Sequence, residues 1–120
     1  MTLQILSIQS DELEPKESGF PDSLEEFDVL VEVELCFKNQ ETNSMYFEFY
    51  VASPLAQMKR STGGFLPPTL LVDEFDWKLI RKHVEKSLMQ ALNCKTWDGV
   101  VIRLNGLLRP SSPSCYKWVL

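Results

Sequence analysis

The strongest constraint on the fold is a regular alternation of apolar and other residues in two neighbouring segments. The odd-numbered positions are apolar throughout residues 29–37 and again from residue 45 to residue 51. A period of two residues is typical of a β-strand with one buried face. The residues between the two segments, 38–44, are polar and suit a turn. We therefore predict an antiparallel hairpin of residues 29–37 and 45–52, with the odd-numbered side chains in the core.

The shared core also limits the register of this hairpin. Because both apolar rows must face the same core, the numbers of two paired residues must have an even sum. One allowed register pairs Lys38 with Ser44 and Glu34 with Glu48, and the next allowed register changes the partners but not the faces. In either register the outer face of the hairpin carries Glu32, Glu34, Tyr46, Glu48 and Tyr50. Like charges directly across a ladder are destabilising, so we expect a Lys or Arg to compensate, from this chain or from another.

Further apolar runs predict strands beside the hairpin, at residues 3–8 and 69–72. Between the first of these and the hairpin, residues 11–26 are acidic and interrupted by proline and glycine, which indicates a long loop. We call residues 11–26 the acidic loop and expect room in it for a turn of helix near Ser23. Weak alternation over residues 115–120 predicts a last edge strand.

Helical spacing of apolar residues is confined to the second half of the chain. Asp76 is a suitable N-cap, and the apolar residues after it recur with the helical period until Asn93. Thr96 is suited to cap a second helix, which Gly106 closes. Residues 55–59 have the length of one helical turn.

These elements predict an α+β fold. The expected architecture is an antiparallel sheet of about four strands with two helices packed on one face. A chain of 120 residues has room for one core, so residues 1–120 are predicted to form a single compact domain.

Charge is divided unevenly along the chain. Residues 1–50 contain twelve acidic residues and two lysines, a net charge of −10, whereas residues 51–120 contain ten basic and five acidic residues, a net charge of +5. A strongly negative region repels nucleic acid and anionic lipid and attracts basic partners. The start of the chain lacks the features of a secretory signal, and no apolar stretch has the length of a membrane span. We therefore expect a cytoplasmic protein that binds neither nucleic acid nor membrane.

The sequence offers few groups for catalysis. His83 is the only histidine, it lies inside the predicted long helix, and no Ser or Cys has a local nucleophile motif. The three cysteines are widely spaced without a Cys-x-x-Cys pair, which predicts free thiols rather than a zinc site. Carboxylates alone can bind hard cations or transfer protons, so a small enzyme or metal-binding domain stays open as an alternative, with the residues Glu32, Glu34 and Glu48. The favoured prediction has no cofactor, no metal and no catalysis.

Three short segments carry a family resemblance: YFEFYVASP at 46–54, LVDEFDW at 71–77 and CKTW at 94–97, with Ile80 and Leu104 following the second and third. Together they resemble the immunity protein 8 family of bacterial polymorphic-toxin systems, over residues 45–108. The resemblance implies a small cytoplasmic antidote, usually encoded beside a secreted toxin used in contact-dependent competition, that binds and blocks the toxin. The aromatic and acidic ending of the family is not reproduced at residues 114–118.

The residues and the resemblance together favour inhibition of a cognate toxin by direct binding. Acidic side chains would neutralise a basic active-site groove, and tyrosines would supply desolvated anchors. The predicted contact residues are Glu25, Glu26, Asp28, Glu32, Glu34, Tyr46, Glu48 and Tyr50. The inhibitor is expected to be a monomer or weak dimer. A third interpretation is a structural subunit that self-associates, its acidic face against the basic half of a neighbouring copy.

Overall fold

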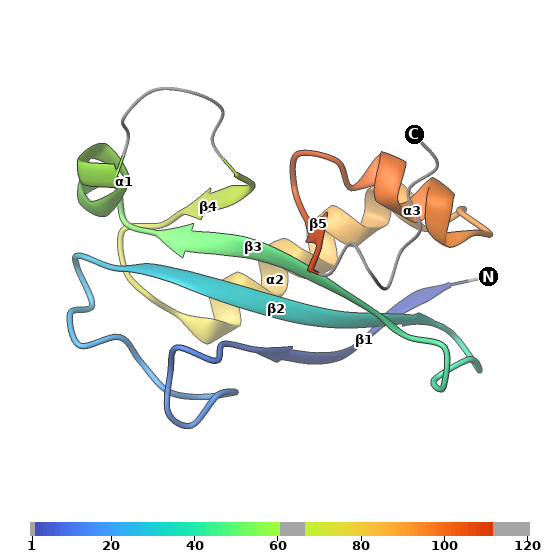
Figure 1. Cartoon of the computed structure of the whole chain (residues 1–120), viewed down its shortest axis with the longest axis horizontal. Helices are drawn as coiled ribbons and strands as arrows, with labels where there is room; N and C mark the ends of the chain where they lie inside the picture. The colour runs from blue at the N-terminus through green and yellow to red at the C-terminus, as the bar shows by residue number, and fades with distance from the viewer. Residues whose placement is uncertain (1, 61–66, 112–120) are drawn as a thin grey trace.

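The computed structural model describes residues 2–60 and 67–111 of the chain. Its elements follow the chain in the order shown in Figure 1. They are β1 (Leu3–Gln9), β2 (Asp28–Phe37), β3 (Met45–Ala52), α1 (Pro54–Arg60), β4 (Thr69–Leu71), α2 (Trp77–Leu88), the 3₁₀ turn η1 (Met89–Ala91), α3 (Trp97–Arg103) and β5 (Arg109–Pro110).

The strands form one mostly antiparallel sheet. β1, β2 and β3 are neighbours in that order, and both pairs are antiparallel. The free edge of β3 is shared by two short strands: β4 runs parallel to residues 50–52, and β5 runs antiparallel to residues 47–48. The predicted α+β class is confirmed, with five strands in the described residues in place of about four, and with one parallel pair.

The predicted hairpin is confirmed, and its register is the second of the two allowed ones. Glu32 lies opposite Glu48 and Leu35 lies opposite Met45, so paired residues have an even sum. The alternative register, with Glu34 opposite Glu48 and Lys38 opposite Ser44, is therefore not the one adopted. The connection contains two successive turns, closed by hydrogen bonds to the carbonyl oxygens of residues 37 and 40. Because these turns lengthen the connection, the paired residues nearest to it are Leu35 and Met45.

A β-bulge explains the less regular pattern of β1. The pairing with β2 shifts between Ile5 and Ser7, which leaves Leu6 as the extra residue. Because of this insertion Leu3, Ile5 and Ile8 all lie opposite core-facing residues of β2, although their spacing is not a strict period of two.

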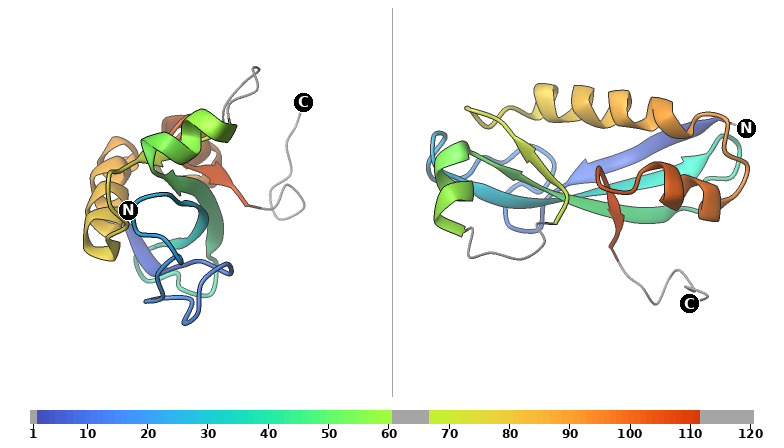
Figure 2. Two further views of the ribbon diagram at one scale, coloured as in Figure 1. Left: turned by 90° about the vertical axis from the view of Figure 1, so that its left-hand side faces the viewer. Right: turned by 90° about the horizontal axis from the view of Figure 1, so that it is seen from above.

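The core lies between one face of the sheet and α2. Val33 and Phe47 are fully buried, in one cluster with Ile80 and Val84 of α2. The Trp97 ring of α3 extends the cluster toward the hairpin connection, because it packs 4.8 Å from the ring centroid of Phe37. Figure 1 shows α2 behind the sheet, and the two views in Figure 2 place it along one side of the strands.

The helix starts agree with the sequence better than the helix ends. Asp76 has an extended backbone, and its side chain accepts a hydrogen bond from the Lys78 amide, as an N-cap does. Thr96 caps α3 in the same way. The long helix ends at Leu88 rather than near Asn93, because a 3₁₀ turn replaces its last residues. α1 has seven residues and is longer than the single turn expected.

The other predicted elements have mixed outcomes. Residues 69–71 form the expected strand beside the hairpin. The turn of helix near Ser23 is wrong, because the Ser23 hydroxyl accepts hydrogen bonds from the amides of residues 25 and 26 within a series of bends. The last edge strand at residues 115–120 lies outside the described residues. No helix among those described has the length and apolar character to cross a membrane.

Candidate functional site

The face of the sheet opposite α2 brings together the five side chains that strand alternation placed there. We call Glu32, Glu34, Tyr46, Glu48 and Tyr50 the outer-face residues. Four of them are half-buried and Tyr46 is exposed. Among the described elements no helix covers this side of β2 and β3, which is turned toward the viewer in Figure 1. The surface is therefore accessible, polar and partly aromatic.

Glu48 has a partner within the chain. Arg109 of β5 lies directly across the ladder from Glu48. Its Nε and Nη2 atoms donate to Glu48 Oε2 at 2.9 and 2.6 Å. The guanidinium also lies 5.8 Å from the ring centroid of Tyr50, in a cation–π arrangement. Arg109 is therefore the compensating cation that the sequence led us to expect. Because it pairs with Glu48, this carboxylate is less available to a binding partner.

Glu34 is held by hydroxyl groups instead of a cation. Ser44 donates to one carboxylate oxygen at 2.6 Å, and Ser7 of β1 donates to the other at 3.4 Å. Tyr46 lies across the ladder from Glu34. The negative charge of Glu34, followed by partial burial, raises the pKa of the Tyr46 hydroxyl above its ordinary value. The ring therefore carries a protonated donor at neutral pH.

Glu32 retains the most unfavourable charge environment. It lies across the ladder from Glu48, and Asp11 of the acidic loop lies nearby. Partial burial, followed by the nearby charge of Asp11 and then that of Glu48, raises the pKa of Glu32, and Lys16 opposes the shift. Three carboxylates therefore lie close together here; Arg109 pairs with Glu48, and Lys16 pairs with Asp11 at 3.2 Å.

The raised pKa of Glu32 predicts how stability depends on pH. The folded protein holds the Glu32 proton to a higher pH than the unfolded chain does, so this group lowers stability as pH rises from about 4.5 through the raised pKa. Glu32→Gln should therefore stabilise the protein at neutral pH, by a few tenths of a kcal/mol to about 1 kcal/mol. Urea denaturation at about pH 4 and pH 7.5 measures the difference, with the exposed Glu85→Gln as control. A gain that is equal at both pH values would contradict the assignment.

The acidic loop is attached firmly to the sheet beside the outer-face residues. Beyond the end of β1, the Glu12 carboxylate accepts a hydrogen bond from the Leu30 amide at 2.8 Å. Ser10 Oγ donates to the Leu30 carbonyl oxygen at 2.7 Å and accepts from the Glu12 amide. Two side chains thus take the place of a neighbouring strand at this part of β2.

Near its middle the same loop is attached to α2. Trp77 Nε1 donates to the Gly19 carbonyl oxygen at 2.7 Å. The Gly19 amide in turn bonds to the carbonyl oxygen of Pro15, which follows a cis peptide bond. A Cβ atom on Gly19 would lie 2.7 Å from two backbone oxygen atoms, so the loop can close in this way only with glycine.

The remaining predicted contact residues do not join the outer-face group. Glu25 and Glu26 are exposed in the bends before β2. Glu26 forms an ion pair with Lys59 of α1. Asp28 begins β2 opposite Ala52, at the end of the hairpin away from its connection. The eight residues therefore divide into an outer-face group of five and a group of three near α1.

Sequence reasoning missed the residues that modify this surface. Ser7, Asp11 and Arg109 come from three separate segments of the chain. The expectation that a Lys or Arg compensates the glutamates pointed to a residue such as Arg109, but it did not say which one. Within residues 2–60 and 67–111, no group of three or more His, Cys, Asp or Glu side chains is placed to hold a metal ion.

A hollow of about 380 Å³ lies between Glu32, Tyr46 and Glu48. Its walls can contact a protein side chain.

Comparison with known proteins places the chain in a family. The family model of immunity protein 8 matches residues 3–109, a wider range than the 45–108 of the sequence resemblance. It takes in β1, the acidic loop and β2, and it ends at Arg109. No curated protein and no solved structure matches the chain. Immunity proteins act against toxins and are generally not enzymes. Because the match covers most of the chain, the protein belongs to the immunity protein 8 family.

Proposed function

We propose that this protein binds a cognate secreted bacterial toxin in the cytoplasm and blocks it, through the outer-face residues and without chemistry of its own. The observation that carries the proposal is the gathering of three carboxylates and two tyrosines on a sheet face that no described helix covers. Family membership supplies the class of partner.

The charge of this face favours a toxin with a basic surface. Glu48 is paired with Arg109, and Asp11 is paired with Lys16 at 3.2 Å, so the negative potential comes mainly from Glu32 and Glu34. A toxin that handles nucleic acid needs a basic groove, and a carboxylate surface competes for that groove directly. The net charge of −10 over residues 1–50 adds attraction at longer range.

The exposed aromatic ring favours a stable complex over a transient encounter. Tyr46 is 43% exposed and stands beside the hollow between Glu32 and Glu48. Tyrosine is enriched among residues that dominate binding energy, because it buries a large apolar area and its hydroxyl still finds a partner. Tyr46 is therefore proposed as the main anchor, and Tyr50, beside Arg109, as a secondary contact.

The contacts of the carboxylates favour binding over the metal-site alternative. Arg109 donates two hydrogen bonds to one oxygen of Glu48, and Ser7 and Ser44 donate to the two oxygens of Glu34. A cation shared by the three glutamates would have to displace these donors. Self-association is also disfavoured as the main role, because Arg109 supplies from within the chain the compensation that a neighbouring copy would otherwise provide.

Reversal of the charge on the outer face tests the proposal. The double variant Glu32→Lys with Glu34→Lys should associate about tenfold more slowly with the cognate toxin domain, and its association rate should depend less on salt. The control is Glu41→Lys with Glu85→Lys, which changes the net charge equally at exposed positions elsewhere. Surface plasmon resonance at two salt concentrations gives the rates, and circular dichroism checks folding. Equal slowing in both variants would show that only net charge matters, which contradicts a contact at this face.

A further inference from the structure

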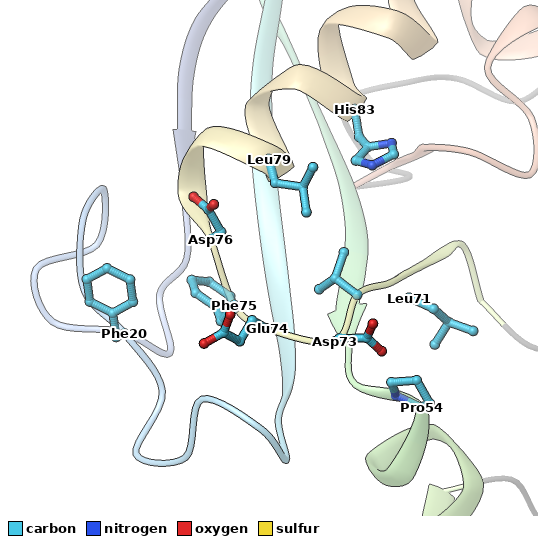
Figure 3. A pocket seen from close by; sticks show the side chains of 10 residues that line it. Phe20, Pro54, Leu71, Asp73, Glu74, Phe75, Asp76, Leu79 and His83 are labelled. Carbon is cyan, nitrogen blue, oxygen red and sulfur yellow. The ribbon is translucent and has the colours of Figure 1, made fainter.

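A second surface, formed by other elements, has the features of a peptide-binding groove. It is an open groove of about 650 Å³ at the start of α2. Figure 3 shows Phe20 and Phe75 on one side, Leu71 and Pro54 on the other, and Leu79 and His83 reaching in from α2. We call it the α2 groove.

Three exposed apolar side chains form part of the walls of the α2 groove. Phe20, Leu71 and Leu79 expose 59%, 53% and 37% of their surface. Isolated exposed apolar side chains are common on soluble proteins, but several lining one concave site indicate a binding surface. The three come from the acidic loop, β4 and α2, so only the folded chain places them together.

Aromatic packing fixes the Phe20 wall in place. Phe75 is 4% exposed, and its ring contacts those of Phe20, Phe27 and Trp77 edge to face, at centroid distances of 6.1, 5.5 and 5.3 Å. The hydrogen bond from Trp77 to Gly19 holds the neighbouring backbone. Phe20 is therefore held outward on a packed base, as an interface anchor requires.

The rim of the α2 groove is acidic. Asp73 and Glu74 are exposed in the connection between β4 and α2, and within the described residues neither forms an ion pair. Asp76 is occupied by capping α2, since its Oδ1 atom accepts from the Lys78 amide at 2.9 Å. Two carboxylates therefore remain available beside apolar walls.

We propose that the α2 groove binds a segment of the cognate toxin in which one large apolar side chain is flanked by lysine or arginine. The apolar side chain would lie between Phe20, Leu71 and Leu79, and the basic residues would meet Asp73 and Glu74. Charge complementarity selects this occupant, because the rim repels nucleic acid and acidic peptides. The inference rests on the proposed function for the identity of the partner, and it adds a contact separate from the outer-face residues.

The chemistry of the α2 groove is tested with a synthetic peptide as the probe. The peptide Gly-Ser-Lys-Leu-Lys-Arg-Ser-Gly, titrated into ¹⁵N-labelled protein, should shift the amide signals of residues 71–79 and of Phe20 saturably. Its affinity should fall at least tenfold when its leucine becomes serine, when its basic residues become glutamate, or when the protein carries Asp73→Asn with Glu74→Gln. Shifts that do not saturate, or that spread to the outer-face residues with equal strength, would overturn the proposal.

The contribution to toxin binding is measured with the full toxin domain. Phe20→Ala, and separately Asp73→Asn with Glu74→Gln, should each weaken the complex at least fivefold, whereas Glu85→Gln elsewhere on α2 should leave it unchanged. Both changes are at exposed positions, so folding should survive, and circular dichroism verifies it. Toxin affinity within twofold of wild type in both variants would overturn the inference.

Failure of the proposed function would look different. If wild-type protein does not bind the toxin domain, the proposed function fails, and the peptide titration alone then decides whether the groove binds basic apolar segments. If the groove variants weaken toxin binding and the outer-face variants do not, the inference stands and the outer face is excluded as the main contact.

Discussion

Replacing Phe47 by alanine is expected to lower the free energy of unfolding by about 3–5 kcal/mol. Phe47 is fully buried at the centre of β3, opposite Val33, and its ring lies 6.2 Å from that of Trp97. The substitution removes apolar contacts and leaves a cavity between the sheet and the helices, which β2 and β3 cannot fill without moving. The loss would be a large fraction of the stability of a domain of this size.

Urea denaturation followed by circular dichroism measures this change, provided that the slope of the transition is the same in both proteins. The matched control is the adjacent substitution Tyr46→Ala, on the other face of the same strand. It should cost much less, because Tyr46 is exposed. Equal losses at the two positions would contradict the assignment of the faces of β3.

The same Tyr46→Ala variant should have its large effect on binding. We expect it to weaken the toxin complex by about 1–4 kcal/mol, mainly through faster dissociation, because aromatic anchors influence the lifetime of a complex more than its formation. Surface plasmon resonance separates the two rates. Stability measured in parallel ensures that the loss belongs to the interface.

Tyr46→Phe is the informative control for this prediction. It keeps the ring and removes the hydroxyl beside Glu34, so it should retain most of the affinity if the buried apolar area dominates. If the complex with the Tyr46→Ala variant dissociates at the wild-type rate, this part of the outer face is ordinary solvated surface.

The hairpin could be predicted from the sequence because its cause is local. Alternation over residues 29–37 and 45–52 determines which side chains face the core, and a one-residue slip would expose all of them. The same parity placed the five outer-face residues together. The alternation could not distinguish between registers two residues apart, because both bury the same side chains. The turns after Phe37 determine which register forms.

The partners of the outer-face residues could not be predicted, because they depend on contacts between distant segments. Arg109 is separated from Glu48 by 61 residues and lies in a strand of two residues, too short to show a pattern. Asp11 lies near Glu32 because its two neighbours, Ser10 and Glu12, form hydrogen bonds to Leu30 of β2. Local periodicity contains no information on either arrangement.

The α2 groove shows a similar limit for a different reason. In the sequence, Phe20 is one aromatic residue in an acidic loop broken by proline and glycine, and nothing nearby suggests that it contacts Phe75. From its composition, the acidic loop was predicted only to be charged. The structure shows that it also provides an apolar wall.

The attachment of the acidic loop at its start and at its middle has a thermodynamic consequence for recognition. A loose loop that becomes ordered on binding loses about 1–2 kcal/mol of backbone conformational entropy per residue, which weakens the complex. Here Glu12 and Ser10 hold the start of the loop to β2, and Trp77 holds Gly19 at its middle, so folding has already restricted the first half of the loop. A partner that contacts this half of the loop therefore meets a smaller ordering penalty than one that binds a loose loop.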